Sequence, residues 1–330
     1  MADQILSGEQ GSEQSSEQST EPGSSGSEST TTVVIAFAAN LAIAIAKTVV
    51  ALITGSASML AESAHSWADT GNQILLFIAD RRSKRPPDGS HPFGYGREAY
   101  VWSMFAALGL FTVGAVVSVW NGVTKLLEPG EEASYTWAYV VLGIAFLLEG
   151  VSFLQAFRQT RREARSLHRD IFQHALATSD PTLRAVFAED SAALIGLVVA
   201  GLGIFLHQVT GDAAYDAVGS IIVGVLLGVV AVVLINRNLR FLTGQESDAR
   251  LRDAAVARLK RMSEVVRVTY LRLEFVGPRQ VLLVASVDLA GERPESEVAY
   301  VLRELEGRLE EDPNVTEAVL TLATPDEPSL

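Results

Sequence analysis

Long apolar blocks are the feature that most constrains what this chain can fold into. A helix that crosses a membrane needs about 20 consecutive, largely apolar residues. Five blocks of that kind stand between polar segments of the sequence: Val33–Gly55, Tyr100–Leu126, Trp137–Phe157, Phe187–His207 and Ala217–Ile235. The pattern predicts an α-helical polytopic membrane protein.

A sixth block, Ser56–Ala79, is less apolar but completes the topology. Its apolar frame is interrupted by Glu62, His65, Asp69, Asn72 and Gln73. When it is counted as a span, the basic loop residues fall into alternate loops, and the remaining loops contain no Lys or Arg. Because basic loops stay on the cytoplasmic side, we expect six transmembrane helices with both termini in the cytoplasm. The expected location is the cell (inner) membrane, as a multi-pass protein.

The basic residues behind this orientation form three groups. Five follow the second span, six follow the fourth, and two follow the sixth. They are Arg81, Arg82, Lys84, Arg85 and Arg97; Arg158, Arg161, Arg162, Arg165, Arg169 and Arg184; and Arg237 and Arg240.

The net charge of −13 lies almost entirely at the two ends of the chain. Residues 1–31 carry six acidic residues and no Lys or Arg, and residues 245–330 carry 17 acidic against 11 basic residues. Since no basic face remains to neutralise phosphates, we expect no nucleic-acid partner. The first 31 residues also lack the apolar content of a core, which predicts a disordered acidic tail.

The sequence thus divides into the tail at 1–31, a six-helix transport domain at 32–244 and a cytoplasmic domain at 245–330. In the last part, Ser247–Met262 and Glu295–Glu310 have helical periodicity. Val265–Val276, Gln280–Leu289 and Asn314–Leu322 alternate apolar and polar residues as strands do. The order predicts a small α-β-β-α-β, ferredoxin-like α+β domain.

The second span carries the strongest candidate for a functional site. His65 and Asp69 are four residues apart, which places them on one face of a helix, about one turn from each other. Ionisable groups inside a membrane are costly, so they are functional candidates by default. An imidazole and a carboxylate at this spacing can bind one divalent ion. The structural alternative is hydrogen bonding to neighbouring helices; the ligand reading is favoured. Asn72 continues this face and Glu62 precedes it.

Other spans add ionisable residues at similar depth. The fifth opens with Asp180–Pro181, typical of a helix cap, and then carries Glu189 and Asp190, which point about 100° apart. The fourth carries Glu149, either a ligand or a hydrogen-bonding group between helices. Lys47 in the first span is expected to pair with one of these carboxylates or to extend to the interface. Such a cluster is typical of a cation pathway or a proton relay.

These residues resemble the cation diffusion facilitator family. Ala61–Asp69 is similar to its His-x3-Asp motif, which supplies half of a tetrahedral zinc site, and His91–Arg97 is similar to its cytoplasmic signature. Ser179–Pro181, Glu189–Ala193 and Tyr215–Ser220 resemble the branch that contains zinc transporter nine. With the architecture, the resemblance covers residues 32 to 325. It implies a homodimeric, proton-coupled exporter of a divalent cation, most often zinc, that works by alternating access.

On this resemblance, His65, Asp69 and Asp190 are the metal ligands, with Glu149 or Glu189 as the fourth and Glu149 slightly favoured. Asn72, Glu62 and Lys47 are assigned to the pathway or to contacts behind the ligands. No cofactor besides the transported ion is expected.

Three departures from the family bear on the metal. Val186 stands where zinc members place a histidine, and a more oxygen-rich site accepts manganese, iron or cobalt more readily. Tyr95 stands where many members have a second histidine, which favours a turn over a metal site at Asp88 and His91. The C-terminal domain contains no histidine, so a dimer-bridging zinc cluster is not expected there. The remaining histidines, His168, His174 and His207, are expected to be solvated, and Asp216 to cap a helix.

The sequence bears on two other functions. An intramembrane metalloenzyme normally needs a His-Glu-x-x-His motif, and no such pair of histidines is present. A transporter-like metal sensor or scaffold without transport is the second, and Val186 is the residue that favours it.

Overall fold

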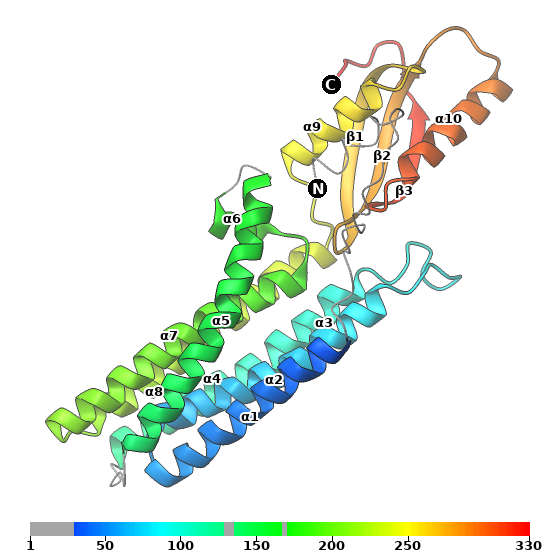
Figure 1. The fold of residues 1–330 in the computed structure, drawn as a ribbon. Helices are drawn as coiled ribbons and strands as arrows, with labels where there is room; N and C mark the ends of the chain where they lie inside the picture. Colours follow the sequence, from blue (N-terminus) through cyan, green and yellow to red (C-terminus); the bar gives the residue numbers. More distant parts are fainter. Residues whose placement is uncertain (1–29, 129–134, 167–169) are drawn as a thin grey trace, which may run out of the picture.

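The computed structural model describes residues 30–128, 135–166 and 170–330. The predicted tail up to residue 29, the loop at 129–134 and His168 lie outside the described residues. Long helices form an elongated bundle, and a smaller domain with a sheet stands at one end of it (Figure 1).

The bundle follows the predicted order of spans. Five stretches within the described part are long and apolar enough to cross a membrane: Phe37–Thr54, Glu98–Leu127, Thr136–Arg165, Pro181–Thr210 and Ala214–Leu242. The helices that carry them are α1 (Thr30–Thr54), α3 (Glu98–Ala106) with the π-helical turn Ala107–Phe111 and α4 (Thr112–Leu127), α5 (Thr136–Ser166), α7 (Pro181–Thr210) and α8 (Ala214–Leu242). This confirms a helical membrane domain.

The weaker sixth block is helix α2 (Ala57–Ser83), 27 residues long. It is more polar than the five apolar stretches, but it runs side by side with α1, α4 and α8 in the bundle (Figure 1). Its polar side chains are buried between these neighbours and not exposed on the outer surface. Burial against protein is how a membrane helix tolerates ionisable groups.

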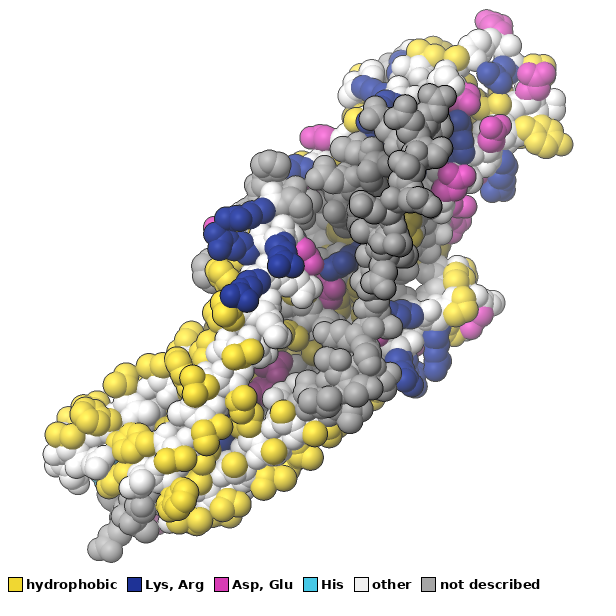
Figure 2. Space-filling model, in the orientation of Figure 1, with side chains coloured by type: hydrophobic (Ala, Val, Ile, Leu, Met, Phe, Trp, Pro, Cys, Tyr) yellow, Lys and Arg dark blue, Asp and Glu magenta, His cyan; other side chains and the backbone are white. Residues whose placement is uncertain are grey.

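The outer surface of the bundle is apolar. Large apolar side chains are about two-thirds to three-quarters exposed, among them Leu52, Trp120, Leu147 and Val209. Figure 2 shows hydrophobic side chains covering this face of the helices, with charged side chains gathered toward the other end of the molecule. A bilayer is the solvent that suits such a surface, because its hydrocarbon is as apolar as the side chains.

The C-terminal domain has the predicted α-β-β-α-β order. Its elements are α9 (Ala249–Lys260), β1 (Val265–Gly277), β2 (Gln280–Leu289), α10 (Glu295–Glu310) and β3 (Val315–Leu322). β1 and β2 pair antiparallel as a hairpin, and β2 and β3 pair parallel, in the order β1-β2-β3. Leu259, Leu305 and Leu309 of the helices are buried against Val268 and Leu283 of the sheet.

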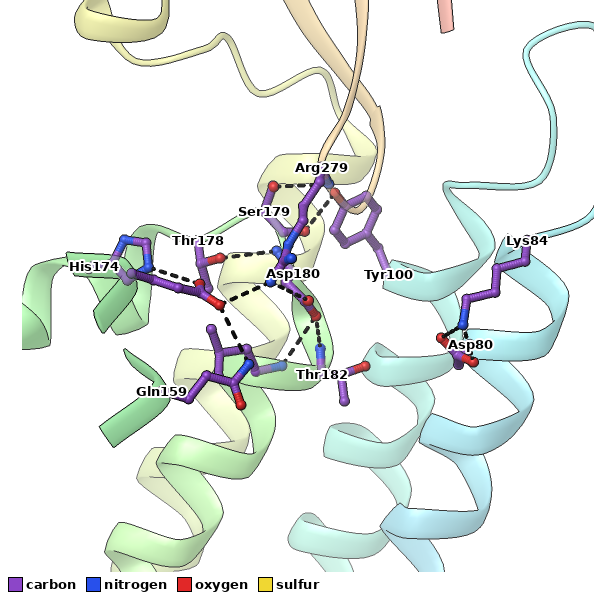
Figure 3. Close-up of polar contacts among 12 residues, drawn as sticks. Asp80, Lys84, Tyr100, Gln159, His174, Thr178, Ser179, Asp180, Thr182 and Arg279 are labelled. Atoms are coloured by element: carbon purple, nitrogen blue, oxygen red, sulfur yellow. Dashed lines mark hydrogen bonds and ion pairs between the residues drawn. The ribbon is translucent and has the colours of Figure 1, made fainter. Parts of the chain in front are cut away.

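The hairpin turn of this domain meets the membrane helices (Figure 3). The amide of Arg279 donates to Ser179 Oγ at 3.2 Å, and its guanidinium lies 3.1 Å from Glu163 and 3.6 Å from Asp180. Tyr100 of α3 donates to the Ser179 carbonyl at 2.9 Å. The turn therefore contacts α5 and the residues just before α7, and Tyr100 of α3 holds the same segment from the other side.

A short helix, α6 (Ile171–Ala177), was not predicted, and it corrects one expectation. His174 on this helix is buried, not solvated, with Nε2 3.3 Å from Glu163. His207 is also buried, with its ring edge-on to Tyr135. Arg184, taken above for a loop residue, is buried in α7 and donates to the Thr178 carbonyl. The burial of these three residues depends on how segments of the chain pack together, which a local sequence pattern does not reveal.

Asp216 does cap a helix, but a different one from its own. It lies in the first turn of α8, and its carboxylate accepts from the amides of Ala57 and Ser58 and the hydroxyl of Ser56, at 2.5 to 3.1 Å. These groups form the N-terminus of α2, whose amides have no partners within the helix. Asp216 thus fixes the helix that carries His65 and Asp69.

Replacing Asp216 by alanine should lower the free energy of unfolding by about 3 kcal/mol, because it orphans several buried donors at once. Thermal unfolding of the purified protein in detergent measures the change. Asp216→Asn, which keeps one acceptor oxygen, should lose less, and Asp253→Ala on the exposed face of α9 should lose almost nothing. Equal melting temperatures for Asp216→Ala and the wild type would contradict this role.

Candidate functional site

One buried face of α2 carries the candidate ligands. Glu62, His65, Asp69 and Asn72 follow one another at intervals of three and four residues, so they form a stripe along the helix. Between 0 and 8% of each residue is exposed. The helix begins at Ser56, whose side chain accepts from the amide of Met59, and no Gly or Pro interrupts it before residue 71.

His65 and Asp69 form the centre of this stripe. His65 Nε2 lies 3.1 Å from Asp69 Oδ2, so the two side chains are in direct contact. Among the described residues, His65 Nε2 and Asp69 Oδ1 are buried without a hydrogen-bond partner. Buried polar atoms normally have partners, so two such atoms on neighbouring side chains need an account. A divalent cation is a partner that both atoms can bind.

Two carboxylates from α7 approach Asp69. Glu189 lies within hydrogen-bonding reach of Asp69 and accepts a hydrogen bond from Asn72 Nδ2. Asp190 accepts from Ser152 Oγ of α5 at 2.9 Å and interacts electrostatically with Asp69. The adjacent side chains therefore diverge, Glu189 toward α2 and Asp190 toward α5, as expected for successive residues on a helix.

Lys47 of α1 does pair with carboxylates, and it pairs with two of them. Its Nζ lies 3.0 Å from Glu62 Oε2 and 2.9 Å from Glu149 Oε1. Lys47 and Glu62 are fully buried, and 14% of the Glu149 side chain is exposed. Glu149, one of the two candidates for a fourth ligand, is thus held by an ammonium group in this structure.

The site residues gather between α1, α2, α5 and α7 without closing around one point. Within the described part of the chain, no three His, Asp or Glu side chains are arranged as a ready metal site. His65 and Asp69 are side by side, Glu189 and Asp190 face Asp69, and Glu149 is turned toward Lys47. Binding an ion here would require these side chains to rotate toward one another.

Two residues of this region were missed from the sequence. Ser152 holds Asp190, and it lies three residues after Glu149 on an otherwise apolar helix, a spacing that could have revealed it. Gly196 of α7 lies against Glu62: a Cβ added there would be 2.5 Å from Glu62 Oε1. The local sequence gives no signal that predicts the contact between Gly196 and Glu62.

The loop at Asp88–Tyr95 is held as a turn, in line with the structural reading. The Asp88 carboxylate accepts from the amide and hydroxyl of Ser90, the amide of His91 and the hydroxyl of Tyr95. These hydrogen bonds, those from Ser90 first, hold the pKa of Asp88 well below its usual range. The carboxylate oxygens are therefore already engaged within the loop.

A comparison with known families decides what kind of bundle this is. The model of the cation efflux transmembrane domain matches residues 33–243, which is more than half of the chain. The chain belongs to the cation efflux family. This is a family of transporters and not of enzymes, in line with the expectation from the motifs in α2 and α7.

Several curated members of the cation efflux family are similar to this chain. Metal tolerance protein C4 of Arabidopsis thaliana is 36% identical over 234 residues, covering 71% of this chain and 51% of that protein. The human mitochondrial proton-coupled zinc antiporter SLC30A9 is 38% identical over 194 residues, covering 59% and 34%. An uncharacterized transporter of Methanocaldococcus jannaschii is 24% identical over 293 residues, covering 86% and 94%. The chain thus spans about a third to a half of the length of the first two.

The position where typical zinc members of the cation efflux family carry a histidine is filled by packing here. Val186 lies one turn before Asp190 on α7, is half buried, and packs against an apolar cluster that includes Leu76, Ala185 and Ala192. No donor atom is available at this position, so His65 is the one imidazole among the candidate ligands named from the sequence.

Proposed function

We propose that this protein exports a divalent metal cation, most readily Zn²⁺, from the cytoplasm in exchange for protons. The observation that carries the proposal is the His65–Asp69 pair, buried in the membrane domain with unpartnered atoms and faced by Glu189 and Asp190. Family membership supports transport of a cation. The names of the relatives, among them a proton-coupled zinc antiporter, support the choice of ion and of counter-ion.

The proposed ligands are His65, Asp69 and Asp190, and Glu149 or Glu189 supplies a fourth oxygen. A mixed nitrogen and oxygen set of four suits Zn²⁺, whose protein sites are tetrahedral. Asn72 and Glu62 lie behind these ligands, Asn72 by holding Glu189 and Glu62 by holding Lys47. The ion enters and leaves by alternating access, in which the helices around the site open to one side at a time.

The remaining features of the proposal concern orientation, which follows from charge, and the membrane and assembly, which follow from the family resemblance. Both termini and the domain at 245–330 lie in the cytoplasm, because the basic loops lie at the same end of the bundle. The membrane is the cell (inner) membrane, and the active form is a homodimer. Residues 1–31 are an acidic tail outside the transport domain at 32–244.

Two alternatives rest on Val186. A site with one imidazole and several carboxylates also suits Mn²⁺, Fe²⁺ or Co²⁺, since these ions accept oxygen ligands more readily than zinc does. A metal sensor or scaffold without transport is the other alternative, because one ligand position is apolar.

Uptake of metal into proteoliposomes separates these functions. Vesicles that contain the purified protein and an acidic interior should accumulate Zn²⁺, measured with an indicator dye trapped inside, whereas protein-free vesicles should not. Mn²⁺, Fe²⁺ and Co²⁺ supplied in competition rank the ions. A protein that binds Zn²⁺ but accumulates none of these ions is a sensor or scaffold, and the transport proposal is then wrong.

A further inference from the structure

Lys47 is an unusual group to find in the wall of a cation pathway. Its side chain is completely buried in the membrane domain, at a high cost unless it is paired. It forms two ion pairs, to Glu62 of α2 and to Glu149 of α5, residues 15 and 102 positions away in the sequence. One ammonium and two carboxylates leave a net charge of −1, so charge neutrality alone does not explain the arrangement.

The two partners of Lys47 are held differently. Glu62 is fully buried, and its second oxygen lies so close to Gly196 of α7 that there is no room for a Cβ at that position. Glu149 is partly exposed, and its second oxygen has no hydrogen-bond partner among the described residues. Each carboxylate thus has one buried oxygen without a hydrogen-bond partner among the described residues. The two differ in packing, because Glu62 is fully buried against Gly196 whereas Glu149 is partly exposed.

The ion triad also lies next to the proposed metal ligands. Glu62 is one turn before His65 on α2. Glu149 interacts electrostatically with both His65 and Asp69, and it precedes by one turn Ser152, which holds Asp190. The carboxylate of Glu149 therefore contacts Lys47 and lies in the neighbourhood of the candidate ligands.

We propose that Lys47 is a tethered cation that competes with the transported ion for Glu149. Before a cation binds, Glu149 pairs with Lys47 through the 2.9 Å contact described above. When a divalent cation binds at His65, Asp69 and Asp190, Glu149 rotates to it as the fourth ligand, and Lys47 keeps Glu62 alone. When Glu149 returns to Lys47, the ion loses a ligand and is released. The inference rests on the proposed function and adds a residue that sets affinity and release.

A tethered competitor has a kinetic signature that charge balancing lacks. A positive charge near the site weakens ion binding, and a partner waiting for Glu149 speeds release; both effects depend on Lys47. Removing Lys47 should thus tighten binding and slow turnover together. A residue that only stabilises the fold would not lower KM when it is removed.

The experiment uses the double variant Lys47→Met/Glu62→Gln in proteoliposomes, with Zn²⁺ as the probe. The double change keeps the net charge of the triad at −1 and leaves Glu149 without its competitor. We expect KM for Zn²⁺ and the maximal rate to fall together, each by about tenfold, within the range of ordinary coupling between two sites. The matched control is Asp80→Asn/Lys84→Met, an exposed pair with a 2.7 Å contact farther along α2, which should behave like the wild type.

The outcomes are distinct. A folded double variant with wild-type KM and rate means that Lys47 only balances charge, and the inference is overturned. If the double variant does not fold, Lys47→Arg decides, because a bidentate guanidinium holds Glu149 more firmly and should raise KM; an unchanged KM overturns the inference. A wild type that transports no Zn²⁺ overturns the proposed function, and this inference with it.

Discussion

Replacing Asp69 by alanine is expected to abolish Zn²⁺ transport while leaving a folded membrane protein. Asp69 is the residue where the site converges, since His65 lies 3.1 Å from it and Glu189 and Asp190 face it from α7. Loss of a group that merely orients a metal ligand lowers metal affinity or activity by about 10- to 100-fold. Loss of the ligand itself should therefore lower the uptake rate by at least about 100-fold. Initial rates of Zn²⁺ uptake into proteoliposomes measure the effect.

The control for this variant is Asp80→Asn. Asp80 is also on α2, but it is exposed and pairs with Lys84, so its neutralisation should leave the uptake rate within about a factor of two, as for most surface changes. His65→Ala and Asp190→Ala should resemble Asp69→Ala. Normal transport by Asp69→Ala would remove Asp69 from the site. Thermal unfolding of each variant shows whether a lost rate reflects a lost fold.

The membrane helices and the C-terminal domain were predictable because both have strong local patterns. An apolar block of 20 residues has few other uses, and the hairpin and the helix at 265–310 follow periods of two and 3.6 residues. The predicted limits of Gln280–Leu289 and Glu295–Glu310 coincide with β2 and α10. The short helix α6 was missed because seven residues inside a polar segment give too little periodicity.

The contacts between distant segments were not predictable. The sequence indicates that Lys47 needs a partner in the membrane, but only the packing of α1 against α2 and α5 selects Glu62 and Glu149. The capping of α2 by Asp216 joins residues about 160 positions apart. Local spacing gives the face of a helix that a side chain occupies, and it does not say which helix lies opposite.

The spacing of His65 and Asp69, by contrast, needed no tertiary information. Residues four apart on a helix are neighbours whatever surrounds them, which is why the structure places these two 3.1 Å apart. The directions of Glu189 and Asp190 were predictable in the same way, because successive residues on a helix point about 100° apart. The donors to these carboxylates, Asn72 for Glu189 and Ser152 for Asp190, depend on the packing of α7 against α2 and α5.

Dissipating an imposed pH gradient is expected to slow Zn²⁺ uptake and to lower its steady-state accumulation. The accumulation should fall by about tenfold for each proton exchanged per pH unit of gradient, because one pH unit is worth about 1.4 kcal/mol per proton. The physical reason is the crowding of acids around Asp69. Glu189 and Asp190 of α7 are held by Asn72 of α2 and Ser152 of α5, close to the His65–Asp69 pair. A ligand must be deprotonated to bind metal, so a bound cation takes the place of protons on these side chains.

The measurement compares proteoliposomes with an acidic interior before and after addition of an ionophore that exchanges K⁺ for H⁺, at equal K⁺ on both sides so that no voltage changes. An uptake rate indifferent to the ionophore would count against antiport. Glu189→Gln sharpens the test, because the amide cannot bind and release a proton as a carboxyl group can. If the Asp69–Glu189 pair carries the exchanged proton, this variant should transport more slowly and lose most of its dependence on the gradient. Ser263→Ala, in the loop before β1 and remote from the bundle, should retain both the rate and the dependence.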